Sequence, residues 1–162
     1  MKLVFLDFDG VLNGCEAPVH RANADTTLVP GSVPWCAAQL DHDKIERLNT
    51  ILERTGAYIV ITTSWKSAES FDLLCHILRF KGLKGFILGA IEHIGRDKEG
   101  VFYYRADEIE HWLDHVKGVE SYVVLDDLDM HQLTPRHVKT ETEVGLQDEH
   151  VERAVEMLNT PV

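Results

Sequence analysis

The chain has 162 residues, which is the size of one ordinary domain. Hydrophobic residues make up 44% and charged residues 27% of it, so a disordered or fibrous architecture is excluded. Sixteen Lys and Arg against 27 Asp and Glu give a net charge of −11, which argues against broad attraction to nucleic-acid backbones or anionic membranes. A small phosphorylated substrate held by a local cation remains compatible with this charge.

The N-terminal part of the chain predicts two strands, a long loop and a helix. Residues 2–8 read as a buried strand that ends in acidic residues. Residues 13–41 contain three prolines and no sustained period, so we expect a loop or small flap that either covers a site or is irregular surface. Residues 43–55 have helical spacing and are followed by a glycine, and residues 58–62 form a second strand.

The rest of the chain continues the alternation of helices and strands. Helices are expected at 67–80, 107–117 and 148–158, and strands at 86–88, 122–125 and 137–140, with 91–104 as loop. The aromatic residues Phe71, Trp65 and Trp112 are interpreted as core. This alternation predicts one Rossmann-like α/β domain over residues 1–162. Its three layers would contain a parallel five-stranded sheet in the order 3-2-1-4-5, without a large cap.

The cysteines and the N-terminus indicate a cytoplasmic protein. The chain has three cysteines, Cys15, Cys36 and Cys75, and their spacing is not that of metal ligands. An odd number of cysteines suits a reducing compartment better than a disulfide framework. The apolar start of the chain is interrupted by aspartates and lacks the uninterrupted apolar core of a signal peptide. No stretch is long enough to span a bilayer.

Polar side chains follow three of the predicted strands where each strand ends. They are Asp7 and Asp9; Thr62, Thr63 and Ser64; and Asp126 and Asp127. In open α/β sheets ligands bind outside the carboxyl ends of the strands, so these side chains should share one crevice. Four clustered carboxylates repel one another, and a divalent cation with oxygen ligands, Mg²⁺, would neutralise them.

The run Asp7-Phe8-Asp9-Gly10-Val11 is the sharpest motif. Alone, two acids at a strand end are often a solvated turn; the apolar strand before them and the second acidic pair favour a site. The run resembles the Asp-x-Asp-x-Val motif of phosphatases of the haloacid dehalogenase-like (HAD) superfamily. The resemblance implies that Asp7 is the nucleophile, and that Asp9 is the general acid and base.

The resemblance also implies the phosphate-binding residues. A Ser or Thr after the second strand would bind the phosphoryl group, and Thr63 is favoured, with Thr62 as the neighbour that a register shift would promote. Ser64 and Gly10 join this set. A third motif supplies a cation, for which Arg105 is the choice and Lys98 the reserve. Arg105 could instead pair with an acid on its own helix face.

The acidic pair of the fourth motif completes the implied metal site. Asp127 would bind Mg²⁺ directly, Asp126 directly or through water, Asp7 through its carboxylate and Asp9 through its carbonyl. Further runs resemble one subgroup, the small HAD domains found alone or within multifunctional RNA-repair proteins: Thr63–Trp65, Arg105–Leu113, Leu125–Asp127 and Gly145-Leu146.

The expected function is Mg²⁺-dependent hydrolysis of phosphomonoesters through an aspartyl phosphate at Asp7. The substrate would be a small phosphorylated molecule or a nucleic-acid end with a 5′ or 3′ phosphate, with no membrane partner and no extended nucleic-acid surface. Two alternatives are a receiver-like signalling module, whose acceptor aspartate would normally follow the third strand, and a HAD domain that binds phosphate without turnover.

Overall fold

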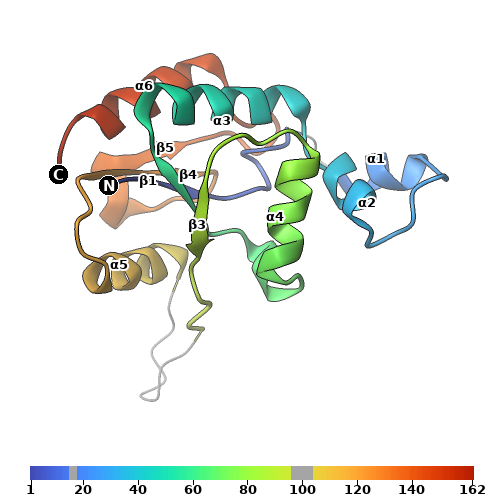
Figure 1. Cartoon of the computed structure of the whole chain (residues 1–162), viewed down its shortest axis with the longest axis horizontal. Helices are drawn as coiled ribbons and strands as arrows, with labels where there is room; N and C mark the ends of the chain where they lie inside the picture. Colours follow the sequence, from blue (N-terminus) through green and yellow to red (C-terminus); the bar gives the residue numbers. More distant parts are fainter. Residues whose placement is uncertain (15–17, 96–103) are drawn as a thin grey trace.

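A parallel sheet of five strands forms the centre of the molecule. The computed structural model describes residues 1–14, 18–95 and 104–162. The strand order is β3-β2-β1-β4-β5, and every neighbouring pair is parallel (Figure 1). The strands are β1 (Lys2–Leu6), β2 (Tyr58–Ile61), β3 (Ile87–Ala90), β4 (Ser121–Asp126) and β5 (His137–Lys139). The predicted Rossmann-like sheet and its order are confirmed.

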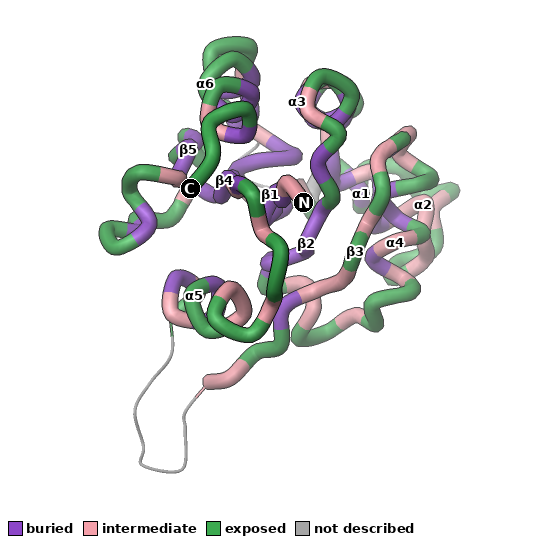
Figure 2. Tube along the Cα trace, turned by 60° about the vertical axis from the view of Figure 1, so that its left-hand side comes forward, coloured by how far each residue is buried: buried purple, intermediate pink, exposed green. Residues whose placement is uncertain are grey.

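Helices cover both faces of the sheet, which gives three layers. On one face α3 (His42–Thr55), α4 (Phe71–Phe80) and α6 (Asp148–Asn159) pack against Val4, Leu6 and their neighbours. On the other face α5 (Arg105–His115) packs against Leu3 and Phe5. Because alternate strand residues point to opposite faces, both faces of the central strands β1 and β4 are buried, whereas the edge strand β3 is partly exposed (Figure 2).

The segment expected as a loop over residues 13–41 contains two short helices. These are α1 (Pro18–Ala24) and α2 (Val33–Ala38), and α2 packs beside α4 (Figure 1). Each spans two turns at most, too short to show a helical period, but Ser32 caps α2 and Pro34 sits in its first turn. Arg21 fastens α1 to the end of α2 through the carbonyls of Ala38 (3.1 Å) and Gln39 (2.9 Å).

Several element boundaries differ from those expected. A 3₁₀ turn, η1 (Ser64–Ser67), follows β2, so α4 begins only at Phe71, with Ser70 as its N-cap. Phe71 therefore lies at the solvent-facing start of α4 and is 41% exposed, so its interpretation as a core residue was wrong. Helix α5 begins two residues earlier than expected, at Arg105. Within the described part of the chain, no helix has the length and apolarity to cross a membrane.

A histidine caps the N-terminus of α6 and should make the fold sensitive to acid. The buried His150 ring accepts a hydrogen bond from the Gln147 backbone N–H (3.0 Å), and burial lowers the pKa of His150 from 6.5. Below pH 6.5 the unfolded chain binds this proton more readily than the folded chain, so stability is lost as the pH falls. A cation at a helix N-terminus is also unfavourable.

We expect His150→Gln to weaken this pH dependence, because Gln in the third helical position can cap without titrating. The measurement is the free energy of unfolding in urea between about pH 7.5 and 5, roughly the range in which histidine titrates, compared between the two proteins. All other titrating groups are common to both, so an identical decline in the two proteins would contradict the role of His150.

Candidate active site

Strand register places the acids of the first and fourth motifs side by side. Leu6 pairs with Leu125 in the parallel ladder, and the Asp7 N–H continues it by donating to the Leu125 carbonyl (3.1 Å). Asp7 and Asp126 follow these residues, so both side chains point to the sheet face that α5 covers. The carboxyl ends of β1 and β4 therefore bring together residues that are more than a hundred positions apart in the sequence.

Arg105, the first residue of α5, bridges these two carboxylates. Its Nη1 donates to Oδ2 of Asp7 and to Oδ2 of Asp126, the latter at 2.6 Å. Both acids are almost fully buried, and the Arg105 side chain is 14% exposed. Among the described residues its ion pairs are with these two acids and not with acids of its own helix. Lys98, the reserve for this position, lies outside the described residues.

Burial sets the electrostatics of this cluster. It raises the pKa of Asp7 to about 6, helped by the charge of Asp126 and opposed by Arg105. Burial likewise raises the pKa of Asp126, again against the pull of Arg105. Burial alone would lower the pKa of Arg105, but the two carboxylates outweigh it and raise that pKa. One guanidinium thus does not fully offset the cost of burying two acids.

A third carboxylate makes the cluster a candidate metal site. Asp7, Asp126 and Asp127 each offer an oxygen, and these oxygens lie within 4.8 Å of one another. Ligands of one Mg²⁺ at about 2.1 Å are at most about 4.2 Å apart, so a small closing movement would suffice. Three carboxylates against one guanidinium leave an excess of negative charge, and an all-oxygen donor set is what Mg²⁺ prefers. The residues present therefore fit a divalent cation.

Gly10 makes the close approach of Asp127 possible. Its φ of +69° lies in the left-handed region, and a Cβ there would stand 2.4 Å from Oδ2 of Asp127. The Gly10 carbonyl accepts a hydrogen bond from Thr140 Oγ1 (2.7 Å), and its N–H donates to Asn13 Oδ1 (2.9 Å). The predicted phosphate-binding donor at Gly10 is thus engaged by Asn13 in this structure.

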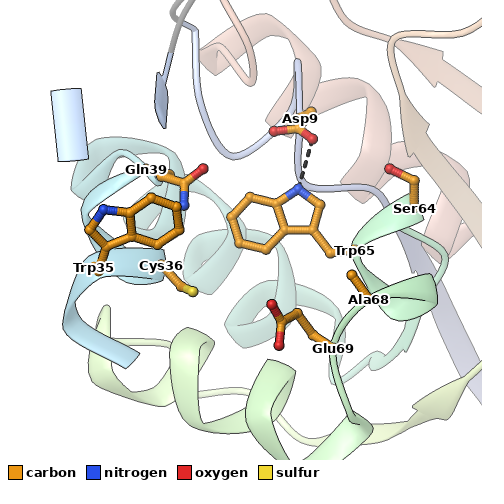
Figure 3. Close-up of a pocket in the computed structure, with 8 residues that line it drawn as sticks. All are labelled: Asp9, Trp35, Cys36, Gln39, Ser64, Trp65, Ala68 and Glu69. Carbon is orange, nitrogen blue, oxygen red and sulfur yellow. Dashed lines mark hydrogen bonds between the residues drawn. The ribbon is translucent and has the colours of Figure 1, made fainter. Parts of the chain in front are cut away.

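Two donors hold the Asp9 carboxylate. Trp65 Nε1 donates to Oδ2 (2.7 Å), and Asn13 Nδ2 donates to Oδ1 (3.0 Å). Asp9 lines a pocket together with Ser64 and Trp65 (Figure 3). The two acids of the first motif therefore stand in different surroundings. Asp7 lies in the carboxylate cluster bridged by Arg105, and Asp9 lies at the pocket wall.

The two candidate threonines differ in their hydrogen bonding. Thr62 follows Ile61, the partner of Leu6, so it stands beside Asp7 in the continued register. Its Oγ1 is buried and has no hydrogen-bond partner among the described residues. Thr63 is also buried, but its Oγ1 accepts from the Trp65 backbone N–H (3.4 Å) as the N-cap of η1. Ser64 is exposed.

With this geometry established, a protein-family profile identifies the chain. The family described as "HAD domain in Swiss Army Knife RNA repair proteins" matches residues 3–151. The chain belongs to this HAD family. The predicted resemblance is confirmed at the level of the subgroup, and membership implies chemistry of the hydrolase or phosphatase kind. No curated protein and no solved structure matches the chain.

Several residues that support the site of this HAD domain were not predicted from the sequence as site residues. Asn13 and Trp65 position Asp9, and Lys66 donates to the Thr62 carbonyl (3.1 Å) and pairs with the buried Glu108 (3.6 Å). Burial lowers the pKa of Lys66, against the pull of Glu108. Trp65 and Lys66 directly follow the Thr62–Ser64 run. The short 3₁₀ turn that orients them leaves no periodic pattern in the sequence.

Replacing Gly10 by alanine should damage the HAD domain more than the same change at Gly56. Both glycines have almost the same left-handed φ, but a Cβ at Gly56 meets nothing within 4 Å. Gly56→Ala should cost about 1–2 kcal/mol of stability for the backbone alone. Gly10→Ala should cost about 1–3 kcal/mol more, because Asp127 must move. It should also reduce the gain in Tm on adding Mg²⁺. An equal loss of stability in the two variants would contradict the close approach of the Asp127 side chain to Gly10.

Removing the unpartnered hydroxyl of Thr62 should stabilise the fold. A buried polar atom without a hydrogen bond costs about 1–3 kcal/mol, so Thr62→Val should raise the free energy of unfolding by about 1 kcal/mol. Thr63→Val, the matched control, should lower it by about 0.5–2 kcal/mol because η1 loses its cap. Urea denaturation measures both free energies of unfolding. A destabilised Thr62→Val variant would contradict the absence of a hydrogen-bond partner for the Thr62 hydroxyl.

Proposed function

We propose that this HAD domain is a Mg²⁺-dependent phosphomonoester hydrolase with Asp7 as its nucleophile. The observation that carries the proposal is the cluster at the ends of β1 and β4. There Arg105 bridges Asp7 and Asp126, and Asp127 brings a third carboxylate within 4.8 Å. Phosphoryl transfer requires such a concentration of positioned charge more than it requires elaborate covalent chemistry.

In the proposed reaction, an Asp7 carboxylate oxygen attacks phosphorus while the bond from phosphorus to the leaving oxygen breaks. Asp9 donates a proton to the leaving oxygen, which departs as an alcohol. A water molecule then attacks the aspartyl phosphate, Asp9 accepts its proton, and Asp7 and inorganic phosphate are released. The hydrogen bonds from Trp65 and Asn13 hold Asp9 in place, and a positioned acid–base group is worth about 100- to 10,000-fold in rate.

The remaining residues would hold the metal and the phosphoryl group. Asp7, Asp126 and Asp127, with the carbonyl of Asp9, would ligate Mg²⁺, which when bound would neutralise the charge of the phosphoryl oxygens. The guanidinium of Arg105 would reduce the repulsion between the two buried acids and would offer a positive charge to the phosphoryl group. Thr63, Ser64 and the Gly10 N–H would contact the phosphoryl oxygens. For Gly10 this requires its N–H to exchange Asn13 for phosphate.

The substrate we propose is a phosphorylated RNA end. The description of the family supports an RNA substrate, and the 5′ or 3′ position of the phosphate is left to the assay. The net charge of −11 disfavours an extended grip on a nucleic-acid backbone, so recognition would be local to the terminal nucleotide.

We also propose a cytoplasmic location. Cys36 and Cys75 are both free thiols, and Cys36 is buried. Free thiols persist in a reducing compartment, where they are not drawn into disulfides.

A receiver-like signalling role is less consistent with the fold. The acceptor of such a module would follow the third strand. Here β3 is an edge strand, separated from Asp7 by β2, and Ala90 and the buried Ile91 stand at its end. A domain that binds phosphate without turnover does not require an acid–base residue at position 9, yet Asp9 is present and is held by two hydrogen-bond donors.

The proposal is tested by assaying para-nitrophenyl phosphate, nucleotides, sugar phosphates and 5′- and 3′-phosphorylated oligoribonucleotides with Mg²⁺. We expect hydrolysis that EDTA abolishes and Mg²⁺ restores. Asp7→Asn should reduce it to background, and Asp9→Asn should reduce kcat by about 100- to 10,000-fold. Asp114→Asn, at an exposed position of α5, is the matched control and should have no effect.

Mass spectrometry of the acid-quenched protein should find a phosphoryl group on Asp7 during turnover. Failure of every phosphomonoester in the panel, or an Asp7→Asn variant with unchanged activity, would refute the proposed function.

A further inference from the structure

A pocket of about 380 Å³ opens beside Asp9, between α2 and η1 (Figure 3). Its wall is formed by Asp9, Trp35, Cys36, Gln39, Trp65 and Glu69. Under the proposed function Asp9 protonates the leaving oxygen, so the pocket lies where the leaving alcohol would stand. What fills this space therefore selects the substrate.

Two indoles stand on opposite sides of the pocket, and each is fixed by its ring N–H (Figure 3). Trp65 Nε1 donates to Asp9 (2.7 Å), and its ring meets Phe8 edge-on, with the centroids 5.4 Å apart. Trp35 Nε1 donates to Asn23 Oδ1 (3.0 Å), which ties α2 to α1. With their N–H groups engaged elsewhere and both side chains partly exposed, the indoles present apolar surface to the pocket.

Two polar side chains that make no hydrogen bond with any described residue also line the pocket. Gln39 is only 5% exposed, and its side-chain amide makes no hydrogen bond with any described residue. The amide atoms are not sealed from solvent, so they are free to pair with a ligand in the pocket. The Glu69 carboxylate, also at the pocket wall, has no hydrogen-bond donor among the described residues. Together they offer two donors and two kinds of acceptor oxygen.

We infer that this pocket binds the base of the nucleoside that leaves from the phosphate. The inference rests on the proposed function and adds to it a subsite for the substrate. A nucleobase is planar, so it stacks on indoles, and its edge carries amino groups and ring nitrogens that pair with an amide and a carboxylate. The negative charge of Glu69 repels a further phosphate, so the pocket takes the uncharged base and not the neighbouring backbone.

This assignment changes the interpretation of Trp65, which the sequence indicated as a core residue. Trp65 contacts the core through Phe8, but it also lines the pocket and holds Asp9. Trp112, with the same interpretation, does pack into the core, where its ring meets Phe5 with centroids 5.5 Å apart. Trp112 thus serves as a control tryptophan remote from the pocket.

The first test compares a 5′- or 3′-nucleoside monophosphate with ribose 5-phosphate, which lacks the base. Trp35→Ala should raise KM for the nucleotide by about 5- to 150-fold, the usual range for one stacked base, and leave KM for ribose 5-phosphate unchanged. Trp35→Phe should restore most of the affinity, and Trp112→Phe should change neither substrate. An equal rise of KM for both substrates would overturn the inference.

Phenyl phosphate distinguishes a nucleobase from another planar ring. It can stack but has no amino group or ring nitrogen that could pair with Gln39 and Glu69. Gln39→Leu should therefore raise KM for nucleotides and not for phenyl phosphate. If Gln39→Leu raises KM for both substrates alike, the assignment to a nucleobase is wrong.

Binding without turnover separates this inference from the proposed function. In the Asp7→Asn variant, adenosine and cytidine should quench tryptophan fluorescence and should lose this effect when Trp35→Ala is added. Absence of nucleoside binding would refute the subsite even if phosphomonoesters are hydrolysed. Conversely, nucleoside binding that depends on Trp35 would support the subsite even if the hydrolase assay fails. Circular dichroism and Tm confirm that each variant is folded.

Discussion

The bridge from Arg105 to Asp7 and Asp126 is the interaction on which the site depends. Two adjacent parallel strands end in carboxylates that their register forces close together, and both acids are buried. The first residue of α5 supplies the opposing charge from the layer that covers this face. Without it, two uncompensated acids would stand in a low-dielectric environment, which is one of the most costly arrangements in a folded protein.

This bridge also explains why the site invites a cation. The guanidinium does not offset burial fully, since the pKa of Asp7 stays raised, and Asp127 adds a third carboxylate. A cluster held in this way keeps an excess of negative charge, which the proposed divalent ion would neutralise. The buried hydroxyl of Thr62 beside the cluster also has no partner among the described residues. Such an atom costs stability unless a ligand forms a hydrogen bond with it.

The turn after β1 connects this cluster to the flap. Gly10 permits the approach of Asp127, Asn13 binds both Gly10 and Asp9, and Trp65 holds Asp9 from the other side. Asp9 thus stands between the charged cluster and the pocket formed with α2. The proposed chemistry and the proposed substrate selection therefore meet at a single side chain, and the short helix α2 contributes to a pocket that the sheet alone would not have.

The sequence by itself determined the sheet, its order and the convergence of the acids. Apolar runs that end in Asp7, Thr62 and Asp126 leave few arrangements, because parallel strands joined by helices place their carboxyl ends at one edge. Only the tertiary structure decided that Arg105 pairs with Asp7 and Asp126 and not with an acid of its own helix. It also decided the different hydrogen bonding of Thr62 and Thr63 and the orientation of Trp35 and Trp65. Each depends on a contact between distant segments or on a turn too short for any periodic signal. A local pattern records which face of an element is apolar, but not which distant side chain meets it.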